Sequence, residues 1–184
     1  MAEAFFQATA WTMDTPKPYG AFHLVLTVLG VSLSIFLARK FSFPERKAGP
    51  DTILFLCGLF LGLTELYKQG FIYYIENGRT YDWWYFPFQL CSVPMYLGLF
   101  IPMVPARIRN VFYLFIQDFG LLGGIMALAE PSGLMHPYWT MTVHGFLWHF
   151  NLIFMGLICA FYNLKTETPK SYLHTIPLFL FCTA

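Results

Sequence analysis

Long apolar stretches separated by short polar connectors constrain this chain more than any other feature. A helix needs roughly 20 residues to cross about 30 Å of hydrocarbon. Inside lipid the backbone must satisfy its own hydrogen bonds, which favours helices. The sequence therefore predicts an all-α fold, a polytopic transmembrane helical bundle of about six helices. The predicted helices cover about residues 21–37, 52–67, 84–104, 111–129, 138–162 and 172–184. The last stretch is still apolar at Ala184, so we expect that helix to be truncated.

The composition excludes an ordinary soluble domain. Hydrophobic residues make up 57% of the 184 residues and charged residues only 11%, against about a quarter charged in soluble domains. A net charge of +1 without a basic run gives no basis for binding nucleic acid. No connector is long enough for a separate domain, so residues 1–184 are expected to form a single integral membrane domain. We expect a multi-pass protein of the cell membrane with membrane lipids as partners, and the oligomeric state is left open.

Lysine and arginine are distributed unevenly between the two sides of the predicted bundle. One side carries Arg39, Lys40, Arg46, Lys47, Arg107, Arg109, Lys165 and Lys170, and the other carries Lys17, Lys68 and Arg79. Because basic residues accumulate on the cytoplasmic side, the N-terminus is predicted to lie outside.

The cysteines give no sign of a metal site or a disulfide framework. Cys57, Cys91, Cys159 and Cys182 stand singly in apolar stretches, without a CxxC pair. We therefore expect no bound metal and no cofactor.

Polar side chains within the apolar stretches are the candidates for chemistry, because such groups are costly in hydrocarbon. They are Glu65, Gln89, Cys91, Gln117, Asp118, His144, His149 and Asn151. Pro94 lies well inside the predicted third helix and is expected to kink it beside Cys91. Cys91 can be a reactive thiol or only a packing residue.

His144 and His149 are five residues apart, so they point about 140° away from each other on a helix. We expect His149 to be the buried, inward one, either functional or hydrogen-bonded for stability alone. Glu65 and Asp118 can be protonated and merely hydrogen-bonded. Glu130 and His136 are expected to be solvated. Gly58-x-x-x-Gly62 and Gly120-x-x-x-Gly124 indicate faces for close helix packing.

Several of these residues lie in a pattern that resembles a known family. The run from Phe86 to Met95 is similar to the "LPLHLCS" helix of the YwaF-like bacterial integral membrane proteins. Gly123 to Leu128, followed by Pro131, resembles that family's "GGLLALLxP" helix end. Phe146 to His149 resembles its "FLSH", and Glu65 falls where the family has a glutamate. The resemblance extends from about residue 52 to 162.

The resemblance implies a chemistry, with two departures. Eukaryotic relatives of that family include a multi-pass phospholipid acyltransferase that uses a cysteine and a histidine from separate helices. Carried over, His149 would be the base and Cys91 the nucleophile, with Glu65 or Gln89 orienting. The eukaryotic "PCHL" pattern, however, reads Phe88 and Gln89 at its cysteine and histidine positions here. Cys91 matches only the bacterial pattern.

These residues support three hypotheses about the function. The first is an intramembrane acyltransferase or hydrolase of lipids, with catalytic His149, Cys91, Glu65 and Gln89 and with His144, Asn151, Gln117 and Asp118 binding substrate. The second is a proton- or solute-coupled transporter or channel component that uses Asp118, Glu65 and the histidines as a relay. The third is a haem-binding bundle with axial ligands such as His23 and His149.

Overall fold

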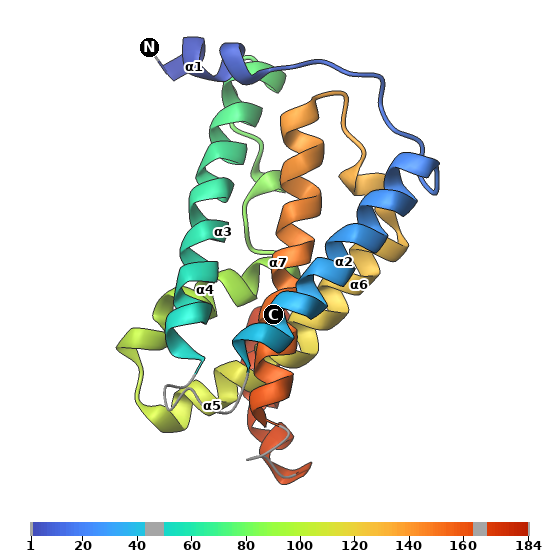
Figure 1. Cartoon of the computed structure of the whole chain (residues 1–184). Coiled ribbons are helices and arrows are strands. Elements are labelled where there is room, and N and C mark those ends of the chain that lie inside the picture. The colour runs from blue at the N-terminus through green and yellow to red at the C-terminus, as the bar shows by residue number, and fades with distance from the viewer. Residues whose placement is uncertain (1, 43–49, 164–168, 184) are drawn as a thin grey trace.

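The computed structural model describes residues 2–42, 50–163 and 169–183. Its α-helices are α1 Ala2–Thr9, α2 Ala21–Phe41, α3 Asp51–Phe71, α4 Val93–Phe100, α5 Ala106–Phe115, α6 Leu121–Ala129, α7 Trp139–Asn163 and α8 Ile176–Thr183 (Figure 1). Short π and 3-10 segments lie between several of the helices from α3 onward, and an isolated bridge pairs Thr12 with Tyr138. The predicted all-α fold is confirmed.

Three helical stretches among the described residues are long and apolar enough to cross a membrane. They are Ala21–Phe41, Ala106–Ala129 and Trp139–Tyr162. The middle one joins α5 and α6 through a π-helical turn, η5 Ile116–Gly120. α3 is as long as α2, at 21 residues, but carries Asp51, Glu65 and Lys68. The bundle therefore combines three apolar spans with a helix of similar length that carries charged residues near its ends.

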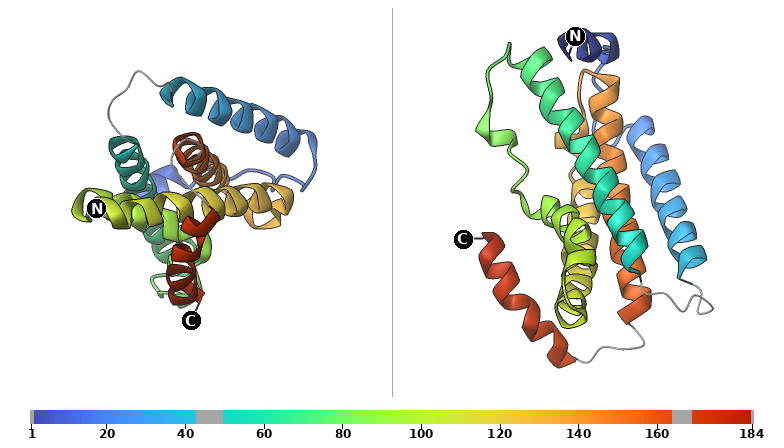
Figure 2. Two further views of the ribbon diagram at one scale, coloured as in Figure 1. Left: turned by 90° about the horizontal axis from the view of Figure 1, so that it is seen from below. Right: turned by 90° about the vertical axis from the view of Figure 1, so that its left-hand side faces the viewer.

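The prediction of a continuous third helix over residues 84–104 is wrong. After α3 and the π-helical turn η1 Ile72–Glu76, the chain has only two 3-10 turns, η2 Trp83–Tyr85 and η3 Leu90–Ser92, before α4. We call residues 77–92 the connecting segment. It runs back beside α3 without regular helix, and α4 begins well below the upper end of the bundle (Figure 2, right). Pro94 does not kink a helix, because it lies in the first turn of α4, where proline is tolerated.

The remaining predicted ranges coincide with helices whose ends differ. α2 and α3 both extend four residues beyond the predicted ends at 37 and 67, and the helix predicted from 111 begins at Ala106. In the last predicted range a 3-10 segment, η7 Pro169–Thr175, precedes α8. The short helix α1 was not predicted. Arg46, Lys47 and Lys165, used for the predicted orientation, lie outside the described residues, and so does the side chain of Cys182.

α7 is the central helix of the bundle. It contacts α2, α3, α5 and α6, and it lies between α2 and α6 when the molecule is viewed along its length (Figure 2, left). Its fully buried Leu152 and Met155 pack with Leu61 of α3 and Phe115 of α5 in one apolar cluster. Residues of α7 are therefore placed firmly relative to most of the other helices.

Two glycines allow helices to approach at backbone distance. A Cβ at Gly58 would lie 2.8 Å from the backbone nitrogen of Leu99, so α4 crosses α3 there. A Cβ at Gly124 would lie 3.0 Å from the carbonyl oxygen of His149, so α6 crosses α7 there. The other glycine of each predicted pair has more room, with nearest contacts of 3.7 Å at Gly62 and 3.4 Å at Gly120.

Candidate functional site

A polar pocket of about 420 Å³ opens between α3, the connecting segment and α7. We call it the polar pocket. Four of the predicted site residues line it: Gln89, Cys91, His144 and His149. Its other polar lining groups are Lys68, Glu76, Ser92 and His136. The structure thus brings residues from opposite halves of the sequence into one cavity.

The connecting segment is held extended by its own sequence. Proline disfavours helical geometry in the residue before it, and Phe86, before Pro87, has ψ 130°. Gln89 is also extended, with ψ 155°. The Asp82 side chain accepts a hydrogen bond from the Trp84 backbone, at 2.9 Å, and starts the 3-10 turn.

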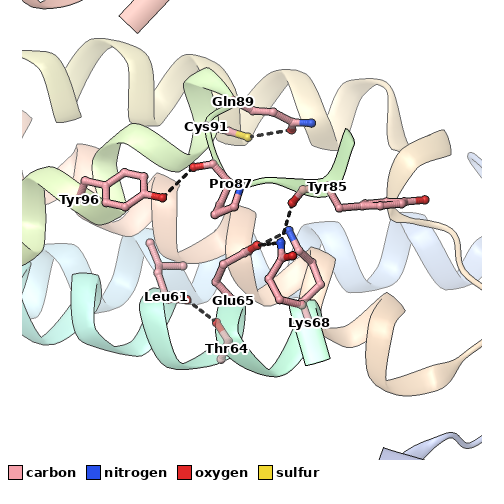
Figure 3. Close-up of polar contacts among 10 residues, drawn as sticks. Leu61, Thr64, Glu65, Lys68, Tyr85, Pro87, Gln89, Cys91 and Tyr96 are labelled. Carbon is pink, nitrogen blue, oxygen red and sulfur yellow. Dashed lines mark hydrogen bonds and ion pairs between the residues drawn. The ribbon is translucent and has the colours of Figure 1, made fainter. Parts of the chain in front are cut away.

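Two side chains fasten the connecting segment to the bundle (Figure 3). The amide of Gln69, on α3, donates to the Tyr85 carbonyl at 2.5 Å. The hydroxyl of Tyr96, on α4, donates to the Pro87 carbonyl at 2.9 Å. Backbone without regular hydrogen bonds is tolerated at membrane depth where it is buried in protein or lines a cavity. The connecting segment meets this condition, because it forms one wall of the polar pocket.

Cys91 lies in the turn that leads into α4. Its thiol points to the amide oxygen of Gln89, with an Sγ–Oε1 distance of 3.7 Å (Figure 3). α6 packs directly behind it, since a Cβ at Gly123 would lie 3.6 Å from the Cβ of Cys91. The amino end of a helix carries a partial positive charge. Cys91 therefore lines the pocket immediately before the amino end of α4, although its partial burial opposes negative charge on the sulfur.

The hydrogen bond of His149 fixes which ring nitrogen can act as a base. Nδ1 lies 2.7 Å from the carbonyl oxygen of Gly145. A carbonyl only accepts, so Nδ1 carries the proton and the neutral ring keeps its lone pair on Nε2. His144, also on the pocket wall, stacks obliquely on Trp148 with ring centroids 5.6 Å apart. Its Nε2 is buried and has no hydrogen-bond partner among the described residues.

Glu65 is buried next to the polar pocket. It is 4% exposed and does not itself contribute to the lining. Its carboxylate lies 2.8 Å from Nζ of Lys68, which does line the pocket, and accepts a hydrogen bond at 2.7 Å from Gln69 (Figure 3). Because Gln69 also holds Tyr85, the carboxylate positions both a cation and the connecting segment. This arrangement suits an orienting role.

Sequence reasoning missed part of this pocket. Lys68 was counted only among the basic residues of one side of the bundle, Glu76 was not singled out, and His136 was expected to be solvated. In the structure Nε2 of His136 lies 3.0 Å from a carboxylate oxygen of Glu76, and both residues line the pocket. The three-residue spacing of Glu65 and Lys68 was an available signal, since such residues share a helix face.

Three predicted substrate-binding residues lie elsewhere. Asn151 donates to the carbonyl of Cys57 at 3.3 Å and lines a mainly apolar pocket between α2, α3 and α7. Gln117 and Asp118 form a hydrogen-bonded pair, at 3.2 Å, in the π-helical turn η5. Gln117 also donates to the Tyr172 hydroxyl, at 3.1 Å. These groups do not contribute to the polar pocket as the structure describes it.

The pair proposed for haem is not arranged around a common space. Nε2 of His23 lies 3.1 Å from the Leu128 carbonyl, at the contact of α2 with α6. His23 is not part of the polar pocket that His149 lines. Within the described residues no group of three or more His, Cys, Asp or Glu is placed to hold a metal ion.

Comparison with known protein families identifies a match over most of the chain. The model of a transmembrane-protein family, described as the TMEM164 family, matches residues 18–184. No curated protein and no solved structure matches the chain.

Proposed function

The chain belongs to the TMEM164 family of transmembrane proteins, and on that premise we propose that it is an intramembrane enzyme that transfers or hydrolyses acyl groups of membrane lipids. The observation that carries the proposal is that Cys91 and His149, from separate elements, line one polar pocket. The YwaF-like pattern around both residues, with its acyltransferase relatives, suggests the reaction.

The proposed transfer has two balanced steps. His149 Nε2 takes the thiol proton of Cys91, and the thiolate attacks the carbonyl carbon of a lipid ester. The ester C–O bond breaks, and the departing lysolipid oxygen takes the proton from His149, which leaves an acyl thioester. The hydroxyl of a second lipid then gives its proton to His149 and attacks the thioester. The C–S bond breaks, and the departing sulfur is reprotonated through His149. Water in place of the second lipid gives hydrolysis.

The surrounding groups support this division of roles. Lys68 and the amino end of α4 partly offset the cost of negative charge on the buried sulfur, so the proposed thiolate depends on proton removal by His149. Glu65, at 2.8 Å, holds the ammonium of Lys68. Gln89, within 3.7 Å of the thiol, orients it.

Acyl exchange between labelled lipids in vesicles that contain the purified protein tests the proposal. Cys91→Ala and His149→Ala should each abolish exchange. Cys57→Ala is the matched control, because Cys57 lines the apolar pocket beside Asn151 and should leave exchange intact. Unchanged exchange in His149→Ala would reject the acyl-transfer mechanism.

Proton-coupled transport is the second candidate. The observation in its favour is Asp118, a half-buried carboxyl in a π-helical turn of an apolar span, since such turns recur at functional sites. Proton uptake by loaded liposomes that disappears in Asp118→Asn would support transport. Absence of any flux would dismiss it.

For the membrane location we propose the cell membrane with the N-terminus outside. The C-terminal end of α2, with Arg39 and Lys40, and the start of α5, with Arg107 and Arg109, lie at the end of the bundle opposite α1 (Figure 1). Basic residues favour the cytoplasmic side. A cysteine introduced at Asp14 should react with a membrane-impermeant maleimide on intact cells. Reaction only after permeabilisation would reverse the orientation.

A further inference from the structure

A second pocket, of about 360 Å³, opens between α3 and α7 next to the polar pocket. We call it the lateral pocket. Thr64 and Tyr67 of α3 form one wall, and Thr140, Val143 and Leu147 of α7 form the other. Met141 and Trp148 of α7 follow Thr140 and Leu147 by one position, line the polar pocket and so lie on the adjacent helix face.

His144 is shared by the two pockets. Its Nε2 is buried and lacks a hydrogen-bond partner among the described residues. Buried polar atoms are nearly always paired, so this nitrogen has the capacity to bind a group that enters from either pocket. The ring also hydrogen-bonds with the Thr64 backbone, so Nε2 of the neutral ring accepts from a hydroxyl, and Nε2 of the protonated ring donates to an ester carbonyl. Glycerolipids offer both groups.

The N-terminal segment closes the upper end of the lateral pocket. The Thr140 hydroxyl donates to the Thr9 carbonyl at 3.2 Å, and the Tyr67 hydroxyl donates to the Thr9 hydroxyl at 2.7 Å. Trp139 donates its backbone N–H to the Trp11 carbonyl at 2.8 Å. The rim therefore carries Trp11 and Trp139, which are 60% and 41% exposed.

The surroundings of this rim identify a lipid as the occupant. Trp and Tyr concentrate at the level of lipid headgroups. His144 lies one turn below Thr140, about 6 Å deeper by the helical rise, where the ester region of a glycerolipid begins. Leu63 and Leu66 of α3 are 59% and 70% exposed beside the pocket, as expected for a surface that faces acyl chains.

We propose that the lateral pocket is the site through which a glycerolipid enters from the leaflet, with its ester or hydroxyl group bound by His144. This inference rests on the proposed acyl transfer and adds the route by which a lipid reaches Cys91. The polar pocket then receives the reacting groups, and the acyl chain stays between α3 and α7.

Crosslinking with a phosphatidylcholine that carries a diazirine in its acyl chain tests the proposal, with the whole protein in phosphatidylcholine vesicles. Crosslinks are expected on the peptide that contains residues 139–147. Val143→Trp fills the lateral pocket and should remove these crosslinks and slow acyl exchange. Leu66→Trp, on the lipid-facing side of α3, is the matched control and should preserve both. Thr64→Leu, on the opposite wall, narrows the lateral pocket by a smaller increase in side-chain volume than Val143→Trp and should also weaken crosslinking.

The rate of Cys91 alkylation by iodoacetamide reports whether the polar pocket is intact. It should stay unchanged in Val143→Trp, because that substitution is expected to block only the lateral pocket. Crosslinks that persist in both Val143→Trp and Thr64→Leu, or that fall on α2 in the wild type, would overturn the proposal. If Cys91→Ala left acyl exchange unchanged while Val143→Trp still removed the crosslinks, the lateral pocket would stand as a lipid site and the acyl-transfer mechanism would fail.

Discussion

Replacement of Gly58 by alanine is expected to destabilise the crossing of α3 and α4. The new Cβ would lie 2.8 Å from the Leu99 nitrogen and 2.9 Å from the Met95 carbonyl oxygen, both backbone atoms that cannot rotate away. Overpacking of this kind costs about 1–3 kcal/mol. Gly62→Ala is the control on the same helix, because its Cβ would meet only a leucine methyl at 3.7 Å.

The two variants share the gain in helix propensity of about 1 kcal/mol that alanine has over glycine. Their difference therefore isolates the steric cost, and Gly58→Ala should be less stable than Gly62→Ala by about 1–3 kcal/mol. Reversible unfolding in mixed micelles by sodium dodecyl sulfate, followed by circular dichroism, measures this difference. Because α4 carries the connecting segment that contains Cys91, Gly58→Ala should also alter Cys91 alkylation. Equal stability of the two variants would refute the close crossing.

Three further predictions concern single contacts. Tyr96→Phe removes the hydrogen bond to Pro87 that fastens the connecting segment. If the segment loses about 1 kcal/mol of stability, Cys91 should be alkylated roughly fivefold faster. An unchanged alkylation rate would show that this bond does not hold the segment. Hydrogen bonds from Ser132 hold the pKa of Glu130 below its usual range, so this carboxylate stabilises the fold above the unfolded pKa and the effect is lost as pH falls through the lower folded pKa. Ser132→Ala should move the Glu130 titration to higher pH, as measured by NMR with Glu130→Gln used to assign the Glu130 signal. An unmoved titration would exclude the Ser132 hydrogen bonds as the cause of the lowered pKa. Asp51 pairs with Arg109 and accepts from Tyr113, so Asp51→Ala should cost about 1–2 kcal/mol in micelle unfolding, and no loss would mean that the cluster is not stabilising.

Apolar composition predicted the helical fold, because long apolar stretches in lipid have to be helical unless protein covers them. Composition could not show where an apolar stretch is not helical. Residues 84–92 are as apolar and aromatic as a span, yet Pro87 keeps Phe86 extended, and the segment lies against the bundle through Gln69 and Tyr96. Those two contacts join residues 16 and 9 positions apart, beyond the three- and four-residue spacings of a helical pattern, so periodicity does not reveal them.

The candidate site was partly predictable, because polar side chains are conspicuous in apolar stretches. Gln89, Cys91, His144 and His149 stand out as polar groups among apolar ones, and all four line the polar pocket. The same criterion selected Asn151, whose amide is instead bonded to the Cys57 carbonyl. It missed Glu76, because a charged residue near a helix end is ordinary until the fold places His136 opposite it.

The cooperation of Cys91 with His149 is the central claim. Its most direct test is reaction of the protein in native membranes with a lipid-permeable probe that acylates activated cysteines and serines. We predict labelling at Cys91 that is lost in both His149→Ala and Cys91→Ala, with Cys57 unlabelled throughout. Labelling of Cys91 that persists in His149→Ala, or no labelling of Cys91 in the wild type, would contradict it.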